Sequence, residues 1–103
     1  MFVHAVYFWL KDGLSDKDRD TFIRGVTSLT TIETVQHGHV GTPADTNRPI
    51  IERSYSYALV LFFPDRAAHD VYQAHPVHDR FREQCATFWR KVLIYDSVGS
   101  ETR

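Results

Sequence analysis

The sequence has little of what several classes of protein require. Its 103 residues include one cysteine, five glycines and four prolines, and 12 basic against 13 acidic residues leave a net charge of -1. The single cysteine, Cys85, excludes an internal disulfide and is typical of a reducing compartment. The balanced charge offers no electrostatic footprint for nucleic acid or an anionic membrane. The glycines are scattered and form no phosphate-binding loop, so we do not expect nucleotide binding.

Long hydrophobic runs are also missing. The N-terminal apolar stretch covers only Phe2 to Leu10, which is too short to span a bilayer, and no basic region precedes it. We therefore expect a cytoplasmic protein without a membrane or nucleic-acid partner. The chain does have a hydrophobic content of 43% and an aromatic content of 14%, which is enough for one globular domain over residues 1–103.

Four segments are typical of β-strands. Residues 2–10 and 54–63 are apolar at both alternating positions, which predicts central strands covered on both faces. Residues 33–41 alternate weakly and predict a more exposed strand, followed by an irregular loop. Residues 92–98 predict the last strand, and we expect a frayed tail over 98–103.

Three helices are expected between these strands. Ser15 is a suitable N-cap for a helix that extends to about Thr31, and Asp65 for a short helix over 66–74. A last helix is predicted from Pro76 to about Lys91. The apolar residues at helical spacing in the first and last helices are expected to be buried. They are Phe22, Val26, Leu29 and Ile32 in the first, and Val77, Phe81, Cys85 and Phe88 in the last, with Trp89 at the edge.

The order β-α-β-β-α-β predicts an α+β domain: a four-stranded antiparallel sheet with the helices on one face. In the usual strand order 4-1-3-2, strands one and three are central, as their apolar pattern requires. The other face of the sheet would be bare in a monomer, so we expect a homodimer that joins two open faces into a barrel. Strands one and four would be antiparallel neighbours, which brings His4 close to Asp96.

The segment from Tyr72 to His78 contains one phenol and two imidazoles on either side of Pro76. Proline disfavours helical geometry in the residue before it, so His75 is predicted to be the N-cap of the last helix. His78 then lies in the first turn, where it could act as a neutral proton acceptor near pH 7 or serve only the turn.

These residues also carry a family resemblance. The pattern consists of His4-x-Val6-x-Phe8, Tyr72-x-x-His75-Pro76-x-His78-x-x-Phe81, Phe88-Trp89 and Ile94-Tyr95-Asp96. It resembles the stress-responsive dimeric α/β-barrel (Dabb) family over nearly the whole chain. The resemblance implies a ferredoxin-like protomer in a homodimeric barrel. One plant branch of the family comprises polyketide cyclases that fold a linear poly-β-keto product by aldol condensation without a cofactor.

By that resemblance, Tyr72 and His78 would be the acid/base pair, and His4 with Asp96 would support them. Phe81 and Trp89 are expected to line the pocket, together with two positions at which this chain departs from the cyclases. The cyclases have a histidine at the position of Tyr57 and a tyrosine at that of Val26. Since hydrogen-bond donors direct how a polyketide folds, the resemblance does not predict that this chain acts on the same substrate as the cyclases.

Two interpretations stay open at this point. One is an enzyme that uses cofactor-free acid/base chemistry on a small aromatic or polyketide-like carbonyl compound. The other is a non-catalytic, stress-associated or ligand-binding dimer. No cofactor or metal is expected, since neither His37 with His39 nor His75 with His78 has an obvious third ligand. Cys85 has no basic neighbour on its helix face and is expected to be an inert thiol. No motif favours a small monooxygenase or a decarboxylating enzyme of similar architecture.

Overall fold

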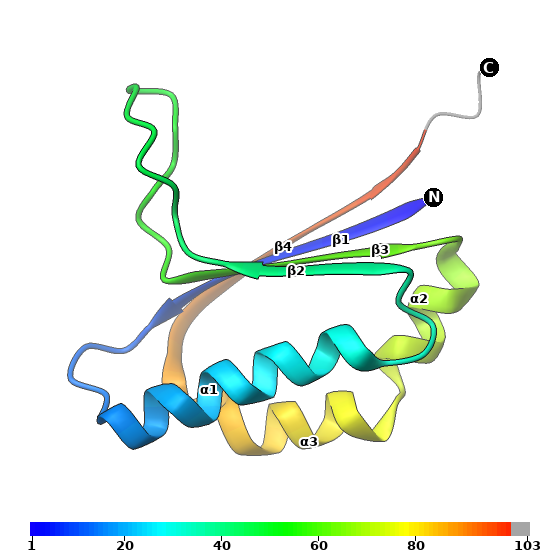
Figure 1. Ribbon diagram of the computed structural model, residues 1–103, viewed down its shortest axis with the longest axis horizontal. Coiled ribbons are helices and arrows are strands. Elements are labelled where there is room, and N and C mark those ends of the chain that lie inside the picture. The colour runs from blue at the N-terminus through cyan, green and yellow to red at the C-terminus, as the bar shows by residue number, and fades with distance from the viewer. Residues whose placement is uncertain (100–103) are drawn as a thin grey trace.

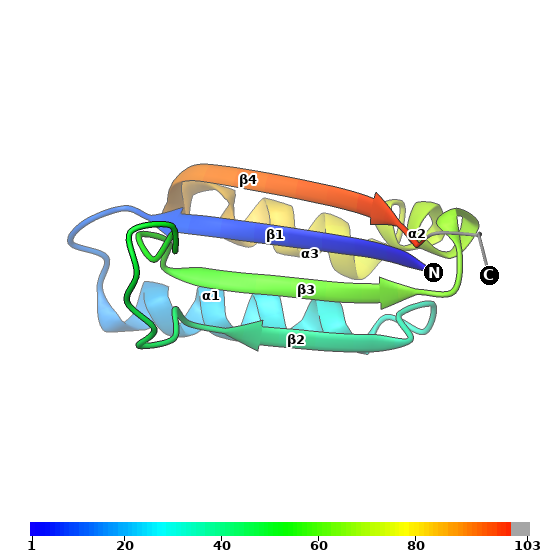
Figure 2. The ribbon, with the colours of Figure 1, turned by 90° about the horizontal axis from the view of Figure 1, so that it is seen from above.

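The computed structural model describes residues 1–99. Four strands form one antiparallel sheet in the order β2-β3-β1-β4, and the helices lie against one of its faces (Figures 1 and 2). The elements in chain order are β1 (Phe2–Leu10), α1 (Asp16–Ser28), a 3₁₀ turn (Leu29–Thr31), β2 (His37–Gly41), β3 (Tyr57–Phe63), α2 (Arg66–Gln73), α3 (Pro76–Cys85), a second 3₁₀ turn (Ala86–Phe88) and β4 (Trp89–Val98). The predicted α+β architecture and strand order are confirmed.

The helix starts follow from their caps. The hydroxyl of Ser15 accepts a hydrogen bond from the backbone N–H of Asp18 (3.0 Å), and a carboxylate oxygen of Asp65 accepts one from Ala68 (2.9 Å). At the third helix, Nδ1 of His75 accepts from the N–H of Val77 (3.0 Å). Each predicted cap therefore satisfies an amide that has no partner within its own helix.

The core lies between the helices and the sheet. Even-numbered residues of β1 face the helices, and the buried residues of α1 and α3 meet them there. The two helices pack tightly at Gly25, where a Cβ atom would lie 2.9 Å from Sγ of Cys85 and 3.1 Å from Cδ1 of Phe81. The core residues are Phe2, Val6, Phe8, Leu10, Phe22, Val26, Leu29, Ile32, Leu59, Leu61, Phe63, Tyr72, Phe81 and Cys85.

Several predicted boundaries were wrong. The second strand begins at His37 instead of residue 33, because the chain first turns at residues 32–35, where the N–H of Val35 donates to the carbonyl oxygen of Ile32 (2.9 Å). The third begins at Tyr57 instead of residue 54, since the hydroxyls of Ser54 and Ser56 instead bond to the indole of Trp9 and the amide of Leu10.

The last helix ends at Cys85 instead of about Lys91. Trp89 already pairs with Leu10 across β1 and β4, so it is the first residue of the strand. Val98 is paired with Phe2, so it is not part of a tail. Residues 100–103 of the predicted tail lie outside the described residues.

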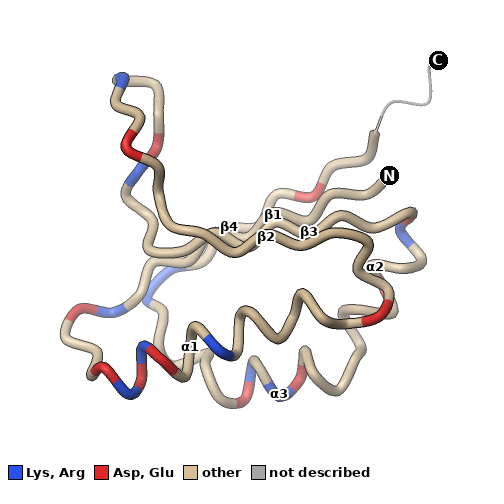
Figure 3. Tube along the Cα trace, viewed as in Figure 1, with Lys and Arg blue, Asp and Glu red and all other residues tan. Residues whose placement is uncertain are grey.

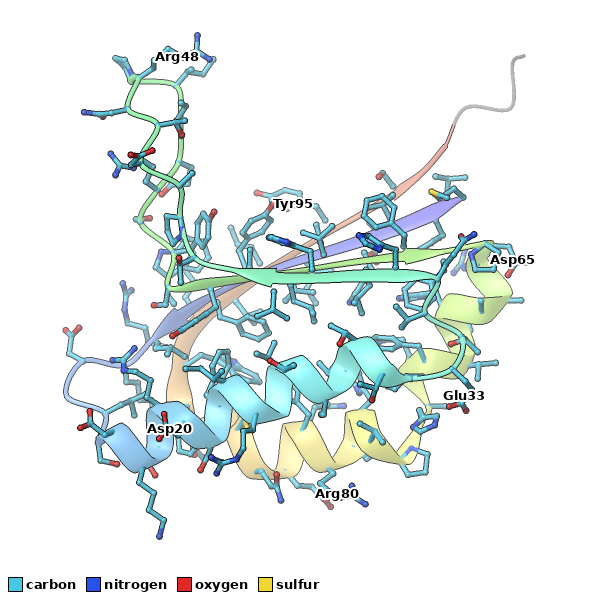
Figure 4. All side chains as sticks on the ribbon, viewed as in Figure 1. Asp20, Glu33, Arg48, Asp65, Arg80 and Tyr95 are labelled. Atoms are coloured by element: carbon cyan, nitrogen blue, oxygen red, sulfur yellow. The ribbon has the colours of Figure 1, made fainter. Side chains whose placement is uncertain are left out.

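The face of the sheet opposite the helices is uncovered over much of its area. Tyr95, exposed and pointing away from the helices, lies on this face (Figure 4). Residues 42–56 project from the same side as an arm, which carries Arg48 near its tip (Figures 1 and 4). Figure 3 shows that charged residues gather on the helices and this arm, while the middle of the sheet has few. The middle of the open face therefore has few Lys, Arg, Asp or Glu residues.

Candidate functional site

His4 and Asp96 form a pair across the two neighbouring strands. Nδ1 of His4 lies 2.5 Å from Oδ1 of Asp96, and the two residues are opposite each other in the β1–β4 register. His4 is buried, whereas the Asp96 side chain is partly exposed. Burial lowers the pKa of His4, and it outweighs the opposing effect of the Asp96 carboxylate. The predicted proximity of these two residues is therefore observed, with the imidazole favoured in its neutral form.

Tyr72 and His78 lie beside this pair. Their ring centroids are 5.0 Å apart in an edge-to-face arrangement, and the ring of His4 is 5.7 Å from that of Tyr72. Burial raises the pKa of the Tyr72 phenol, so it keeps its proton. Burial and the nearby Arg82 lower the pKa of His78, although Asp79 opposes them. Within residues 1–99 no hydrogen bond joins Tyr72 to His78.

A cavity of about 320 Å³ lies between the sheet and the helices at this point. Most of its lining is apolar, and its polar groups come from β1, α2 and α3. The lining residues are His4, Val6, Phe8, Leu29, Leu59, Tyr72, Gln73, His78, Phe81, Arg82, Trp89, Val92 and Ile94. This volume is in the range of small-molecule sites.

Six of the eight residues expected at the site meet at or beside this cavity. Phe81 and Trp89 line the cavity as expected. Asp96 does not line it, but its Oδ1 lies 2.5 Å from Nδ1 of His4, which does. Val26 and Tyr57 are not part of the lining. Val26 is fully buried in the core, and the ring of Tyr57 packs against Phe22 at a centroid distance of 5.5 Å. The expectation that these two positions line the pocket was wrong for this chain.

The remaining candidates have structural surroundings. His75 caps α3, and its Nε2 lies 3.2 Å from Oε1 of Glu33 on the surface. His37 and His39 are exposed on the edge strand β2, away from the cavity. Cys85 is buried, and burial raises the pKa of its thiol, so it is not a ready nucleophile.

His69 is a buried polar residue that the sequence analysis did not single out. It lies on α2 one helical turn before Tyr72, and its ring is 4.4 Å from that of Phe2 and 4.9 Å from that of His4. The spacing 69/72 places both side chains on one helix face, which was the available signal. Which residues of β1 this helix face contacts depends on how β1 is placed in the sheet, so the sequence of α2 alone does not predict the contact between His69 and His4.

The sequence matches one family model from residue 2 to residue 98, and the model describes the stress responsive A/B barrel domain, Dabb. This chain belongs to the Dabb family. A Dabb protein from Mesorhizobium loti with a ferredoxin-like fold is 26% identical, with a TM-score of 0.76 and coverage of 96% of each chain. An Arabidopsis thaliana protein is 25% identical, with a TM-score of 0.79 and coverage of 100% of this chain and 99% of that one.

Other solved structures share the fold. A hydroxynitrile lyase from Passiflora edulis is 20% identical, with a TM-score of 0.78 and coverage of 99% of this chain and 95% of the lyase. Further neighbours from Thermobifida fusca, Bacteroides fragilis and a Jannaschia species are dimeric proteins with a ferredoxin-like fold and unknown function. No protein with a curated description matches this chain. The ferredoxin-like protomer fold expected of a Dabb domain is thus confirmed.

Proposed function

We propose that this Dabb domain is a homodimer that binds a small aromatic or polyketide-like carbonyl compound in each protomer and converts it by cofactor-free acid/base chemistry. One observation carries the proposal. His4, Tyr72 and His78, from three separate elements, converge at one cavity whose remaining lining is mostly apolar. Few convergent polar groups in a mainly apolar pocket are typical of a site that orients a small ligand.

His78 is the proposed base. Its lowered pKa favours the neutral imidazole, which can accept a proton from a carbon next to a carbonyl group. The electron pair of the broken C–H bond then moves to the carbonyl oxygen, giving an enolate. Tyr72 keeps its proton and can donate a hydrogen bond to that oxygen. The enolate carbon is then available to attack a second carbonyl carbon, as in an aldol condensation.

His4 and Asp96 are the proposed supporting pair. With the Nδ1–H of His4 donated to the Asp96 carboxylate, Nε2 is the nitrogen left for a ligand. His4 lines the same cavity as Tyr72, so its second nitrogen can help to place a polar group of the substrate there. The pair thus acts through orientation, and His78 carries the proton.

The open sheet face supports the proposed dimer. A hollow of about 360 Å³ on this face is lined by Ala5, Tyr7, Trp9, Glu52, Tyr55, Leu93 and Tyr95. Apolar and aromatic surface of this kind is typical of a protein–protein contact. Structural neighbours of the domain are dimeric. No helix in residues 1–99 is long and apolar enough to span a membrane. We place the dimer in the cytoplasm, without a nucleic-acid or membrane partner, from the balanced charge and the single free cysteine.

A neighbour with this fold is a hydroxynitrile lyase. This is compatible with an enzymatic role for a ferredoxin-like domain of this shape. At 20% identity the likeness supports the fold, and the chemistry proposed here rests on the cavity.

A non-catalytic ligand-binding dimer is the competing function, and one observation favours it. Nδ1 of His78 is buried and has no hydrogen-bond partner among the described residues. A general base is usually oriented by a third group through its second nitrogen. In the binding-only alternative, the same cavity holds a ligand without abstracting a proton.

Proton exchange tests the proposal without knowledge of the product. In D₂O, NMR would follow the C–H between the two carbonyls of an aromatic 1,3-diketone with and without protein. We expect faster exchange with the wild type, loss of the effect in His78→Gln, and retention in His75→Asn, which keeps a cap outside the cavity. Ligand binding without any acceleration would leave the binding-only dimer as the function.

A further inference from the structure

His69 is a buried histidine to which the proposed chemistry gives no role. Its residue is only 9% exposed, and its Nε2 atom has no hydrogen-bond partner in the described part of the chain. Nδ1 lies 3.2 Å from Oδ1 of Asp70. A buried polar atom without a partner is unfavourable, so an unpaired imidazole nitrogen here calls for an explanation.

Two further side chains of types that can bind a metal lie close to His69. One ring nitrogen from each of His4 and His69 and one carboxylate oxygen of Asp96 lie within 4.8 Å of one another. The three residues come from α2, β1 and β4, so the fold itself brings them together. Both histidines are buried, while the Asp96 side chain is partly exposed and leaves a route to solvent.

We propose that His4, His69 and Asp96 form a binding site for a Zn²⁺ ion. Two imidazole nitrogens and one carboxylate oxygen are a donor set that suits this ion, and three protein ligands leave the fourth tetrahedral position open. The hydrogen bond between Asp70 and Nδ1 of His69 fits this role, since a ligating histidine commonly gives its other N–H to a carboxylate. Nε2 of His69 is then the ligand atom.

The ion replaces the proton that His4 and Asp96 share. When it binds, that proton leaves to solvent, and Nδ1 of His4 and Oδ1 of Asp96 each bond to the metal. These two atoms, now 2.5 Å apart, must separate to about 3.3 Å around a tetrahedral ion. Asp96 can make this movement because it lies on an edge strand with a partly exposed side chain.

The site goes beyond the proposed acid/base function and does not depend on it. A carboxylate that bonds to the ion no longer holds the His4 imidazole by a hydrogen bond. His4 and Asp96 therefore cannot bind the ion and support the acid/base chemistry at the same time. If the chemistry of His78 and Tyr72 operates, Zn²⁺ is expected to inhibit it. Binding itself can be measured without any substrate.

Titration of tag-free protein with Zn²⁺ in a calorimeter, and with Co²⁺ by visible absorption, tests the site. We expect one ion per chain and a tetrahedral Co²⁺ spectrum. His69→Phe keeps an aromatic ring against Phe2 and Phe63 while leaving His4 and Asp96 in place. His69→Phe and Asp96→Asn, each made as a single variant, should each weaken Zn²⁺ binding by at least about tenfold.

The double variant His37→Gln/His39→Gln is the matched control, because it removes two exposed histidines of β2 that are not among the three proposed ligands and should bind as the wild type does. Absence of binding, or binding that His69→Phe leaves unchanged, would overturn the proposal. Loss of binding in the control would overturn it as well, since the ion would then be held on β2. If His69→Phe does not fold, Asp96→Asn on the edge strand decides between these outcomes.

Discussion

Nδ1 of His4 and Oδ1 of Asp96 are 2.5 Å apart although the residues are 92 positions apart in the sequence. The contact exists because the first and last strands are neighbours in the sheet. Burial and the carboxylate act on the imidazole in opposite directions, and burial is the stronger effect. The balance between them can be tested by changing one partner at a time.

Asp96→Asn should lower the pKa of His4 further. The carboxylate favours the imidazolium, and an uncharged amide does not, so burial and the nearby His69, which both lower the pKa, would act unopposed. An NMR titration of the His4 ring protons measures this directly. Asp70→Asn is the matched control, as it removes a carboxylate from α2 without touching the pair. An unchanged or higher pKa of His4 in Asp96→Asn would contradict the argument.

Stability should fall as the pH is lowered through the histidine range. The pKa values of His4 and His78 are lowered in the folded protein from an ordinary value of 6.5. The unfolded chain therefore binds more protons than the folded one at and below that pH, and protonation favours unfolding. Urea denaturation at pH 7.5 and at about pH 5.5 should show a smaller free energy of unfolding at the lower pH.

His4→Gln should reduce that pH dependence, whereas the exposed His39→Gln should leave it as in the wild type. The comparison concerns the slope with pH, so a general loss of stability in His4→Gln does not affect it. A free energy of unfolding that is constant or rises as the pH falls would rule out lowered pKa values for these two groups.

Gly25→Ala should destabilise the protein. In an exposed helix this change would be favourable, by about 1 kcal/mol. Here the added methyl group would lie 2.9 Å from Sγ of Cys85, where α1 packs tightly against α3. We expect a net loss of about 1–3 kcal/mol from overpacking, measured by chemical denaturation.

Two further variants separate packing from helix propensity. Thr27→Ala, at an exposed position of the same helix, should be neutral or slightly stabilising. Cys85→Ala in the Gly25→Ala background should recover part of the loss, because it removes the clashing sulfur. If Gly25→Ala is as stable as the wild type, the helices can separate there without cost.

Tyr95→Asp should separate the proposed dimer. Tyr95 is exposed on the open face (Figure 4), and a carboxylate there would be buried without a partner if two such faces met. Sedimentation at micromolar concentration should give two chains for the wild type and one for the variant. Glu83→Lys, on the outer side of α3, should stay dimeric. A folded wild-type monomer under these conditions would contradict the open-face interface.

His75→Ala should cost stability without affecting the cavity. Its imidazole accepts the amide of Val77 at the start of α3, and loss of an N-cap typically costs about 1 kcal/mol. His75→Asn, which can still cap, should recover most of it. A loss of ligand binding in His75→Ala with unchanged stability would instead place this residue in the site.

The sequence was sufficient for the parts of the fold that depend on local chemistry. Ser15, Asp65 and His75–Pro76 determine where helices start, because caps and proline act on the neighbouring backbone. The end of α3 was misplaced since Phe88 and Trp89 continue the helical spacing of the buried stripe. In the structure Trp89 pairs with Leu10 of β1 and begins the strand. Local spacing could not predict this, because the pairing partner lies far away in the sequence.

The candidate site shows the same division. The closeness of His4 and Asp96 was predicted from strand order, because the start of one antiparallel strand lies beside the end of its neighbour, and the register places the two residues opposite each other. His69 could not be identified in this way, since its surroundings are set by how α2 packs on the start of β1. Val26 and Tyr57 were placed at the pocket by resemblance, whereas the packing of this chain assigns them to the core and to Phe22.

The strand order also has a consequence for biosynthesis. β1 leaves the ribosome before the other three strands, yet one of its two neighbours is β4, whose pairing with it runs from Phe2–Val98 to Leu10–Trp89. The growing chain can pair β2, β3 and β1 early, but the other edge of β1 stays unpaired until β4 has been synthesised. Asp96 reaches His4 only at that last step. A nascent chain arrested before Trp89 would therefore lack three residues that line the cavity, Trp89, Val92 and Ile94.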